Sequence, residues 1–138
     1  MTARPSAGHF LREAVGWMQP WGLAVDGTPR LLAEHVTLAG DSRARRTGLL
    51  GRDALPAGHA LVLAPCQGIH TFGMRFALDV VGVAPDGRVV SIVEALAPWR
   101  VTLSWRAFAI VEVRAGRCRE IDLRVGATRR CSPVRPVE

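Results

Sequence analysis

The chain has 138 residues, of which 49% are hydrophobic and 22% are charged, so it is long enough for one folded domain and too apolar for a disordered chain. Its net charge is +6, and every basic residue is arginine because the sequence contains no lysine. This positive balance permits contact with an acidic partner but does not require one. The composition therefore indicates one globular domain and leaves its partner open.

The N-terminal third is predicted to contain an extension, a strand and a helix. Residues 1–28 form the predicted extension, which ends in Pro, Gly and Asp turn residues. Arg30–Ala39 follows as one expected strand. The only helix predicted in the domain covers about residues 41–50, because Asp41 is a suitable N-cap and Gly51 a suitable C-terminal stop.

The remaining segments read as short strands. His59–Pro65 is an apolar run typical of a buried strand. Leu78–Ala84 and Arg88–Glu94 are β-branched runs on either side of Pro85-Asp86-Gly87, which predicts a hairpin. Phe108–Gly116 predicts another strand, with Ala109, Val111 and Val113 on the face opposite Ile110 and Glu112. One more strand is expected near the C-terminus, before the late prolines.

Short strands separated by turns, with one helix, predict a mainly-β single domain, either a β-sandwich or a partly closed barrel. The expected boundaries place this domain at residues 29–131, between the extension (1–28) and a flexible tail (132–138).

Three blocks of sequence occur in an order that resembles a known family. They are RRTGLLGR (45–52), the run from HALVLAP through CQGIHTFGMRFALDVV (59–81), and IVEVRAG (110–116). From about Leu31 to Thr128 the chain resembles the uncharacterised family named domain of unknown function 192, also called uncharacterised protein family 0127. Met74 and Arg75 keep the Met and the basic residue of the family's central block, whereas Leu50 replaces a usual Met. The resemblance implies a jelly-roll-like sandwich and no established activity.

The densest group of reactive side chains in the sequence lies between Cys66 and Val81. We expect a loop of this group to be exposed on a rigid sheet and to form a binding surface around residues 70–79. The candidate binding residues are His70, Thr71, Met74, Arg75 and Asp79. The leading hypothesis is therefore a non-catalytic module that binds a small molecule or a protein, neither of which the sequence identifies.

The alternative hypothesis is a hydrolase-type enzyme. His70 would act with Cys66 as a nucleophile or with Asp79 as an orienting carboxylate. Nothing in the spacing of these residues forbids such an arrangement, and nothing requires it. Asp79 and Glu112 both interrupt apolar strands, where a carboxylate is costly unless it is paired.

We expect a structural role for Asp79. The predicted partner of its carboxylate is an arginine, either Arg46 or Arg52 from the helix block or Arg75 close by. Such an ion pair would fix the beginning of the strand.

Several ligand classes are not expected. Cys66 and His70, with His59 upstream, lack the usual zinc spacings, so we predict no metal and no cofactor. The arginine runs at 43–46 and 129–130 lack interleaved aromatic residues, so nucleic-acid binding is not expected. No membrane span is predicted, because prolines, histidines and glycines interrupt the uncharged run 54–74. Three cysteines without a Cys-x-x-Cys pair, and no signal-peptide pattern, favour a cytoplasmic location.

Overall fold

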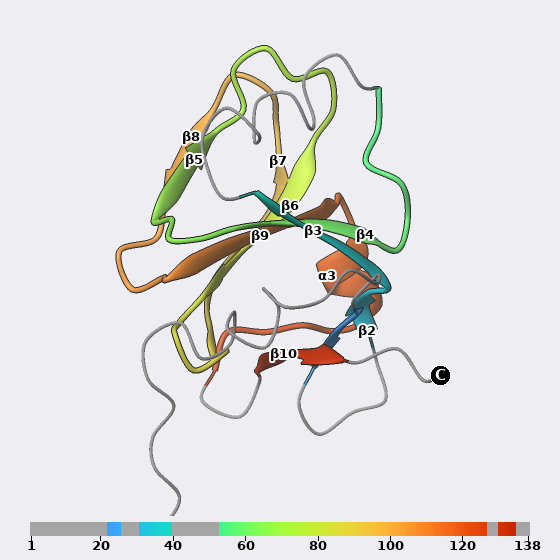
Figure 1. The fold of residues 1–138 in the computed structure, drawn as a ribbon. Coiled ribbons are helices and arrows are strands. Elements are labelled where there is room, and N and C mark those ends of the chain that lie inside the picture. Colours follow the sequence, from blue (N-terminus) through green and yellow to red (C-terminus); the bar gives the residue numbers. More distant parts are fainter. Residues whose placement is uncertain (1–21, 26–30, 40–52, 127–129, 135–138) are drawn as a thin grey trace, which may run out of the picture.

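The computed structural model describes residues 22–25, 31–39, 53–126 and 130–134 (Figure 1). The predicted mainly-β fold is confirmed: the described part contains ten strands and one short helix, arranged in three sheets without a closed barrel. The elements are β1 (Gly22–Val25), β2 (Leu31–Ala33), β3 (His35–Ala39), β4 (His59–Leu63), β5 (Gly68–His70), β6 (Leu78–Val83), β7 (Val89–Leu96), β8 (Val101–Leu103), β9 (Ala109–Arg114), α3 (Arg117–Glu120) and β10 (Cys131–Val134).

A five-stranded sheet in the order β3-β4-β9-β6-β7 forms the centre of the domain. Only β3 and β4 are parallel, and the other neighbours are antiparallel. All six residues of β6 are buried, as are the first five of β9 and the last four of β4. These strands are apolar on both faces because other layers cover both faces of the sheet.

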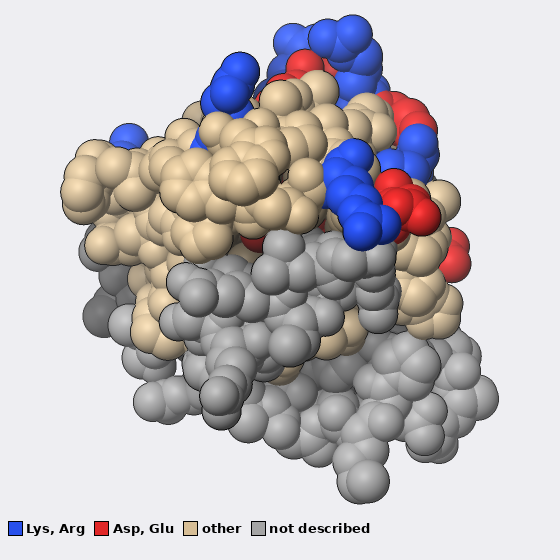
Figure 2. Space-filling view, turned by 90° about the horizontal axis from the view of Figure 1, so that it is seen from above, with Lys and Arg blue, Asp and Glu red and all other residues tan. Residues whose placement is uncertain are grey.

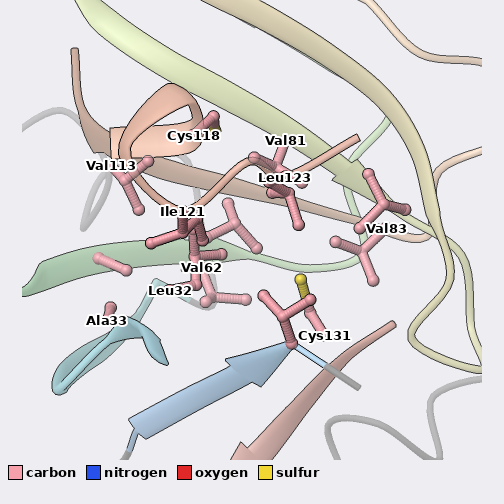
Figure 3. Packing of buried hydrophobic residues seen from close by; sticks show 14 of the residues in the cluster. Leu32, Ala33, Val62, Val81, Val83, Val113, Cys118, Ile121, Leu123 and Cys131 are labelled. Atoms are coloured by element: carbon pink, nitrogen blue, oxygen red, sulfur yellow. The ribbon is translucent and has the colours of Figure 1, made fainter. Parts of the chain in front are cut away.

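Successive side chains of the central strands point into two different cores, as the two-residue period of a strand requires. Val81 and Val83 of β6 join the first core with Val113 of β9 (Figure 3), whereas Leu78 and Val80 join the second. The sheet β10-β1-β2 and α3 cover the first core. The paired strands β5 and β8, with the loop that follows β5, lie on the side of the second core (Figure 1).

The predicted hairpin is confirmed as β6 and β7. Its loop is closed by two backbone hydrogen bonds, from Ala84 N–H to Arg88 O at 2.8 Å and from Gly87 N–H to Ala84 O at 2.9 Å. Gly87 has a φ of 90°, a conformation that glycine adopts without strain. The turn residues therefore have the role that the sequence indicated.

The strand predicted at Arg30–Ala39 is in fact two strands in two sheets. The backbone N–H groups of Glu34 and His35 both bond to Gly58 O, at 2.7 and 2.9 Å, and the chain bends there. β2 then pairs with β1, and β3 pairs with β4. Periodicity alone could not reveal the bend, because Val36 and Leu38 keep the two-residue spacing from Leu32 across Glu34.

Two other details differ from expectation. The sheet β10-β1-β2 includes residues 22–25 and 131–134, which the predicted boundaries assigned mostly to the extension and the tail, and Val25 and Cys131 are buried in the first core. The helix α3 was not predicted, because four residues show no helical periodicity. The helix that was predicted, at about 41–50, lies outside the described residues.

Within the described segments, no helix has the length and apolar character needed to cross a membrane.

Candidate functional site

Strands β5 and β8 form a two-stranded ribbon that presents side chains to solvent. They pair antiparallel, with Ile69 opposite Thr102, and the Ile69 side chain is buried in the second core. Gly68 lies opposite Leu103, and a Cβ at Gly68 would come within 2.5 Å of Leu103 Cδ2. Glycine is therefore needed at this position for Leu103 to lie closely against β5.

Exposed apolar side chains occupy every second position from residue 99 to residue 105, in β8 and in the turns on either side of it. Trp99 is 64% exposed, Val101 58%, Leu103 57% and Trp105 74%. Val101 and Leu103 share one side of β8, and Trp99 and Trp105 lie in the turns before and after this strand. We name these four exposed side chains the apolar row. Figure 2, seen from above, shows an uncharged area of the surface with arginine and acidic side chains along one border.

The ring of His70, the last residue of β5, and the ring of Phe72, which follows β5, lie next to the apolar row. The His70 and Phe72 rings stack with centroids 4.8 Å apart, and the Phe72 and Trp99 rings stack at 5.9 Å. The Phe72 N–H donates to His70 Nδ1 at 3.3 Å, and Phe72 is 45% exposed. We name the apolar row together with His70 and Phe72 the aromatic face.

Thr71 lies between His70 and Phe72 in the sequence. It is fully buried, and it forms hydrogen bonds to the loop that precedes β8. Its hydroxyl donates to Ala97 O at 2.7 Å and accepts the Arg100 N–H at 2.9 Å. Its carbonyl accepts the Trp99 N–H at 3.0 Å, and its own N–H donates to Arg100 O at 2.8 Å. Trp99 has a φ of 64°, which is unusual for a residue with a side chain and requires support of this kind.

The five candidate binding residues do not lie together on one surface. His70 and Arg75 are exposed, and Arg75 Nη1 pairs with Asp53 Oδ1 at 3.3 Å. Thr71, Met74 and Asp79 are buried, with exposures of 0%, 8% and 0%. Only His70 therefore belongs to the aromatic face, and the buried residues support the loops around it.

The sequence reasoning missed the apolar row itself. A signal was present in Trp99–Trp105 (WRVTLSW), where an apolar residue occupies every second position.

Asp79 is a structural anchor, but its observed partners are backbone groups. Oδ1 accepts the Ala95 N–H at 2.9 Å, and Oδ2 accepts the N–H groups of Gly116 and Cys118 at 3.1 and 3.0 Å. These bonds join β6 to β7 and to the start of α3. The expected pairing with Arg75 is wrong, because Arg75 pairs with Asp53. Arg46 and Arg52 lie outside the described residues.

The geometry gives the hydrolase hypothesis no support. Asp79 lies between backbone donors beside Cys118 of the first core, and both of its oxygens are engaged. Cys66 belongs to the second core, and its thiol donates to Gly68 O at 3.0 Å. Among the described residues, no group of three or more His, Cys, Asp or Glu side chains could hold a metal ion.

The other two cysteines are also poor nucleophiles. Burial raises the pKa of Cys131 to about 12. Burial, together with the neighbouring carboxylate of Asp79, raises the pKa of Cys118 well above its usual range. Both thiols are therefore protonated at neutral pH, whereas the thiolate is the reactive form.

Two solved structures have a similar fold. A crystal structure of a protein of unknown function from Novosphingobium aromaticivorans DSM 12444 has a TM-score of 0.68 and 19% identity, with 80% of this chain and 83% of that chain covered. A crystal structure described as "a putative transcription regulator" from Sinorhizobium meliloti 1021 has a TM-score of 0.66 and 21% identity, with 82% and 91% covered. At these identities the likeness concerns the fold alone.

No curated protein matches the sequence significantly. The model of the family DUF192, described as "Uncharacterized ACR", matches residues 23–130. That range is most of the chain and contains all three blocks on which the resemblance rested, so the protein belongs to the DUF192 family.

Proposed function

We propose that the protein is a non-catalytic binding module whose aromatic face binds an extended segment of a protein partner. The observation that supports this most is the apolar row, in which four large side chains at alternate positions are each more than half exposed. Large apolar side chains that gather on a surface, rather than occurring singly, are typical of interaction sites.

The composition of the face fits a protein partner. Tryptophan and arginine are enriched among the residues that dominate binding energy at protein interfaces. Here Arg100 follows Trp99 and Arg106 follows Trp105, so a guanidinium is available near each end of the row. Neither arginine forms an ion pair with a carboxylate of the described residues. A partner with carboxylates at both ends of an apolar stretch would complement this arrangement.

The shape of the face favours an extended segment. Val101 and Leu103 lie two residues apart on β8, with Trp99 and Trp105 in the turns at its two ends, and an extended peptide repeats its side chains with the same two-residue period. In the described sheets β8 pairs with β5 alone, so it is an edge strand. Peptides commonly bind along such edges, where pockets or rows select alternate side chains.

The aromatic face is also preorganised, because contacts within the chain fix its position without a partner. Thr71 fixes the backbone on both sides of Trp99 through four hydrogen bonds, and the Phe72 ring stacks on the Trp99 ring. Binding to a preorganised surface costs less conformational entropy. In this proposal the predicted region 70–79 contributes His70 and Phe72 to contact, and Thr71, Met74 and Asp79 to support.

The test is a selection of peptides from a random displayed library, followed by titration of the selected peptides. We expect sequences with alternating apolar residues and acidic flanks, whose binding shifts the indole N–H resonances of Trp99 and Trp105. Trp105→Ala should weaken binding by about tenfold or more, as expected for an interface anchor. Leu38→Ala is the matched control, because Leu38 is 40% exposed on β3 and lies outside the aromatic face.

Four outcomes would contradict the proposal. The selected peptides could share no apolar pattern, or their binding could be equally insensitive to Trp105→Ala and Leu38→Ala. The same indole resonances could instead broaden with protein concentration alone, which would identify a second copy of the chain as the occupant. Shifts produced by anionic lipid vesicles, without any peptide binding, would identify a membrane surface.

A further inference from the structure

A hollow of about 330 Å³ lies beside the β6–β7 turn, and its lining contains none of the residues of the aromatic face, although Arg106 directly follows Trp105. Its lining residues are Ala84, Pro85, Asp86, Arg88, Val90 and Arg106. The lining thus combines three apolar side chains with two guanidiniums and one carboxylate. Apart from Arg106, whose guanidinium is available to one end of a bound peptide, the proposed peptide binding gives the residues of this hollow no role.

The cationic groups of the hollow are incompletely neutralised. Arg88 Nη2 lies 3.8 Å from Asp86 Oδ2, which is too long for a hydrogen bond. Asp86 Oδ1 instead accepts the backbone N–H of Arg88 at 3.0 Å. The Nε atom of Arg88 is buried and has no hydrogen-bond partner among the described residues. A buried donor without a partner is costly, so it favours any ligand that supplies an acceptor.

Arg106 adds a second available guanidinium. Its side chain is exposed, and no carboxylate of the described residues pairs with it. Most other described arginines are already engaged: Arg114 and Arg117 contact Glu120, Arg119 contacts Glu94, and Arg124 contacts Asp122. The hollow therefore carries a positive charge that is not fully neutralised, whereas most arginines elsewhere on the described surface are paired with a carboxylate.

The two arginines extend from well-defined turns. The turn that contains Arg88 is closed by its own backbone bonds and is held to β10 by the bond from Cys131 N–H to Gly87 O at 2.6 Å. The turn that contains Arg106 is closed from Ala107 N–H to Ser104 O at 3.1 Å. It is joined to the end of β6 by the bond from Phe108 N–H to Val83 O at 2.8 Å. The backbones of both arginines are thus fixed relative to each other.

From this arrangement we infer that the hollow binds a small organic oxyanion, a phosphate ester or a carboxylate with an apolar body. The planar guanidinium matches both kinds of oxyanion with two parallel hydrogen bonds. Pro85 and Val90 offer the apolar wall for the body of the ligand. A few polar groups that orient a ligand against an apolar wall are the usual composition of a small-molecule site.

The test is a calorimetric titration of the full chain with phenyl phosphate and with benzoate, in low salt. Inorganic phosphate and benzyl alcohol are the control ligands, the first without an apolar body and the second without a charge. We expect phenyl phosphate or benzoate to bind at least about tenfold more tightly than either control, and the better of the two identifies the oxyanion. Arg106→Gln should weaken that binding by about tenfold. Arg100→Gln, an exposed arginine outside the hollow, should leave it unchanged.

Arg88→Gln should also weaken binding, and if that variant fails to fold, Arg106→Gln alone decides the question. Equal losses in Arg106→Gln and Arg100→Gln would overturn the inference, because they would indicate unspecific attraction to a basic protein. Binding of inorganic phosphate as tight as that of phenyl phosphate would overturn it as well. Trp99→Ala should not affect the titration, so this site and the aromatic face can fail independently.

Discussion

Thr71 fixes the backbone of Trp99: the Thr71 carbonyl accepts the Trp99 N–H at 3.0 Å, and Trp99 has a φ of 64°. One fully buried threonine thereby determines the position of the indole that begins the apolar row. Its hydroxyl lies between Ala97 O and Arg100 N–H, at 2.7 and 2.9 Å. A residue that the sequence placed in the binding surface instead supports that surface from beneath.

Thr71→Val keeps the shape of the side chain and removes the hydroxyl, so it tests this support. The Arg100 N–H would lose its side-chain acceptor, and we expect the free energy of unfolding to fall by about 1–3 kcal/mol in urea denaturation. The fluorescence anisotropy of Trp99 should fall as well, measured in a chain where the other tryptophans are replaced by Phe. Thr37→Val, at an exposed position of β3, is the control. Equal stability of the two variants would remove the role assigned to the hydroxyl.

Individual strands could be predicted where the apolar pattern of a short segment is enough to determine them. The central strand β4 follows from an apolar run, and β6, β7 and β9 follow from runs rich in β-branched residues and from the turn sequence Pro85-Asp86-Gly87. The bend at Glu34 could not be predicted, because it depends on the Gly58 carbonyl, which is distant in the sequence. The same holds for the partners of Asp79: its need for donors was evident, but the donors are backbone groups of Ala95, Gly116 and Cys118.

Gly87→Val tests the turn between β6 and β7. With a φ of 90° at Gly87, a β-branched side chain is strained, and we expect the free energy of unfolding to fall by about 1 kcal/mol or more. Gly126→Val is the matched control, because a Cβ at Gly126 would meet no atom within 4 Å. Thermal denaturation of the two variants should therefore separate them, and equal midpoints would contradict the strain at Gly87.

Asp79→Asn tests the carboxylate that joins β6 to β7 and to α3. An amide in this place could not accept from all three N–H groups, since its nitrogen would face at least one donor. We expect a loss of about 1–3 kcal/mol in the free energy of unfolding. Asp53→Asn removes a carboxylate of an exposed ion pair and should have little effect. Comparable losses in the two variants would show that the buried contacts of Asp79 contribute no more than a surface ion pair.

The buried thiols predict a loss of stability at alkaline pH. The pKa of Cys131 is about 12 in the folded chain, against an ordinary value of 9.0, because burial disfavours the thiolate. Between these two values the unfolded chain releases a proton that the folded chain keeps. The stabilisation is thus complete below pH 9 and declines as the pH rises toward 12, by at most about 1.4 kcal/mol per pH unit for this thiol.

Cys131→Ala should make this decline shallower, and urea denaturation at several pH values between 8.5 and 11 measures the slope. The composition makes the experiment unusually clear. The chain has no tyrosine and no lysine, and arginine stays charged in this range, so the cysteine thiols are the main side chains that titrate. Cys131→Ala also lowers the free energy of unfolding at every pH, because packing is lost. Only the slope of this free energy against pH depends on the ionisation of the thiol. Identical slopes in the parent chain and in Cys131→Ala would mean that burial does not raise the pKa of Cys131.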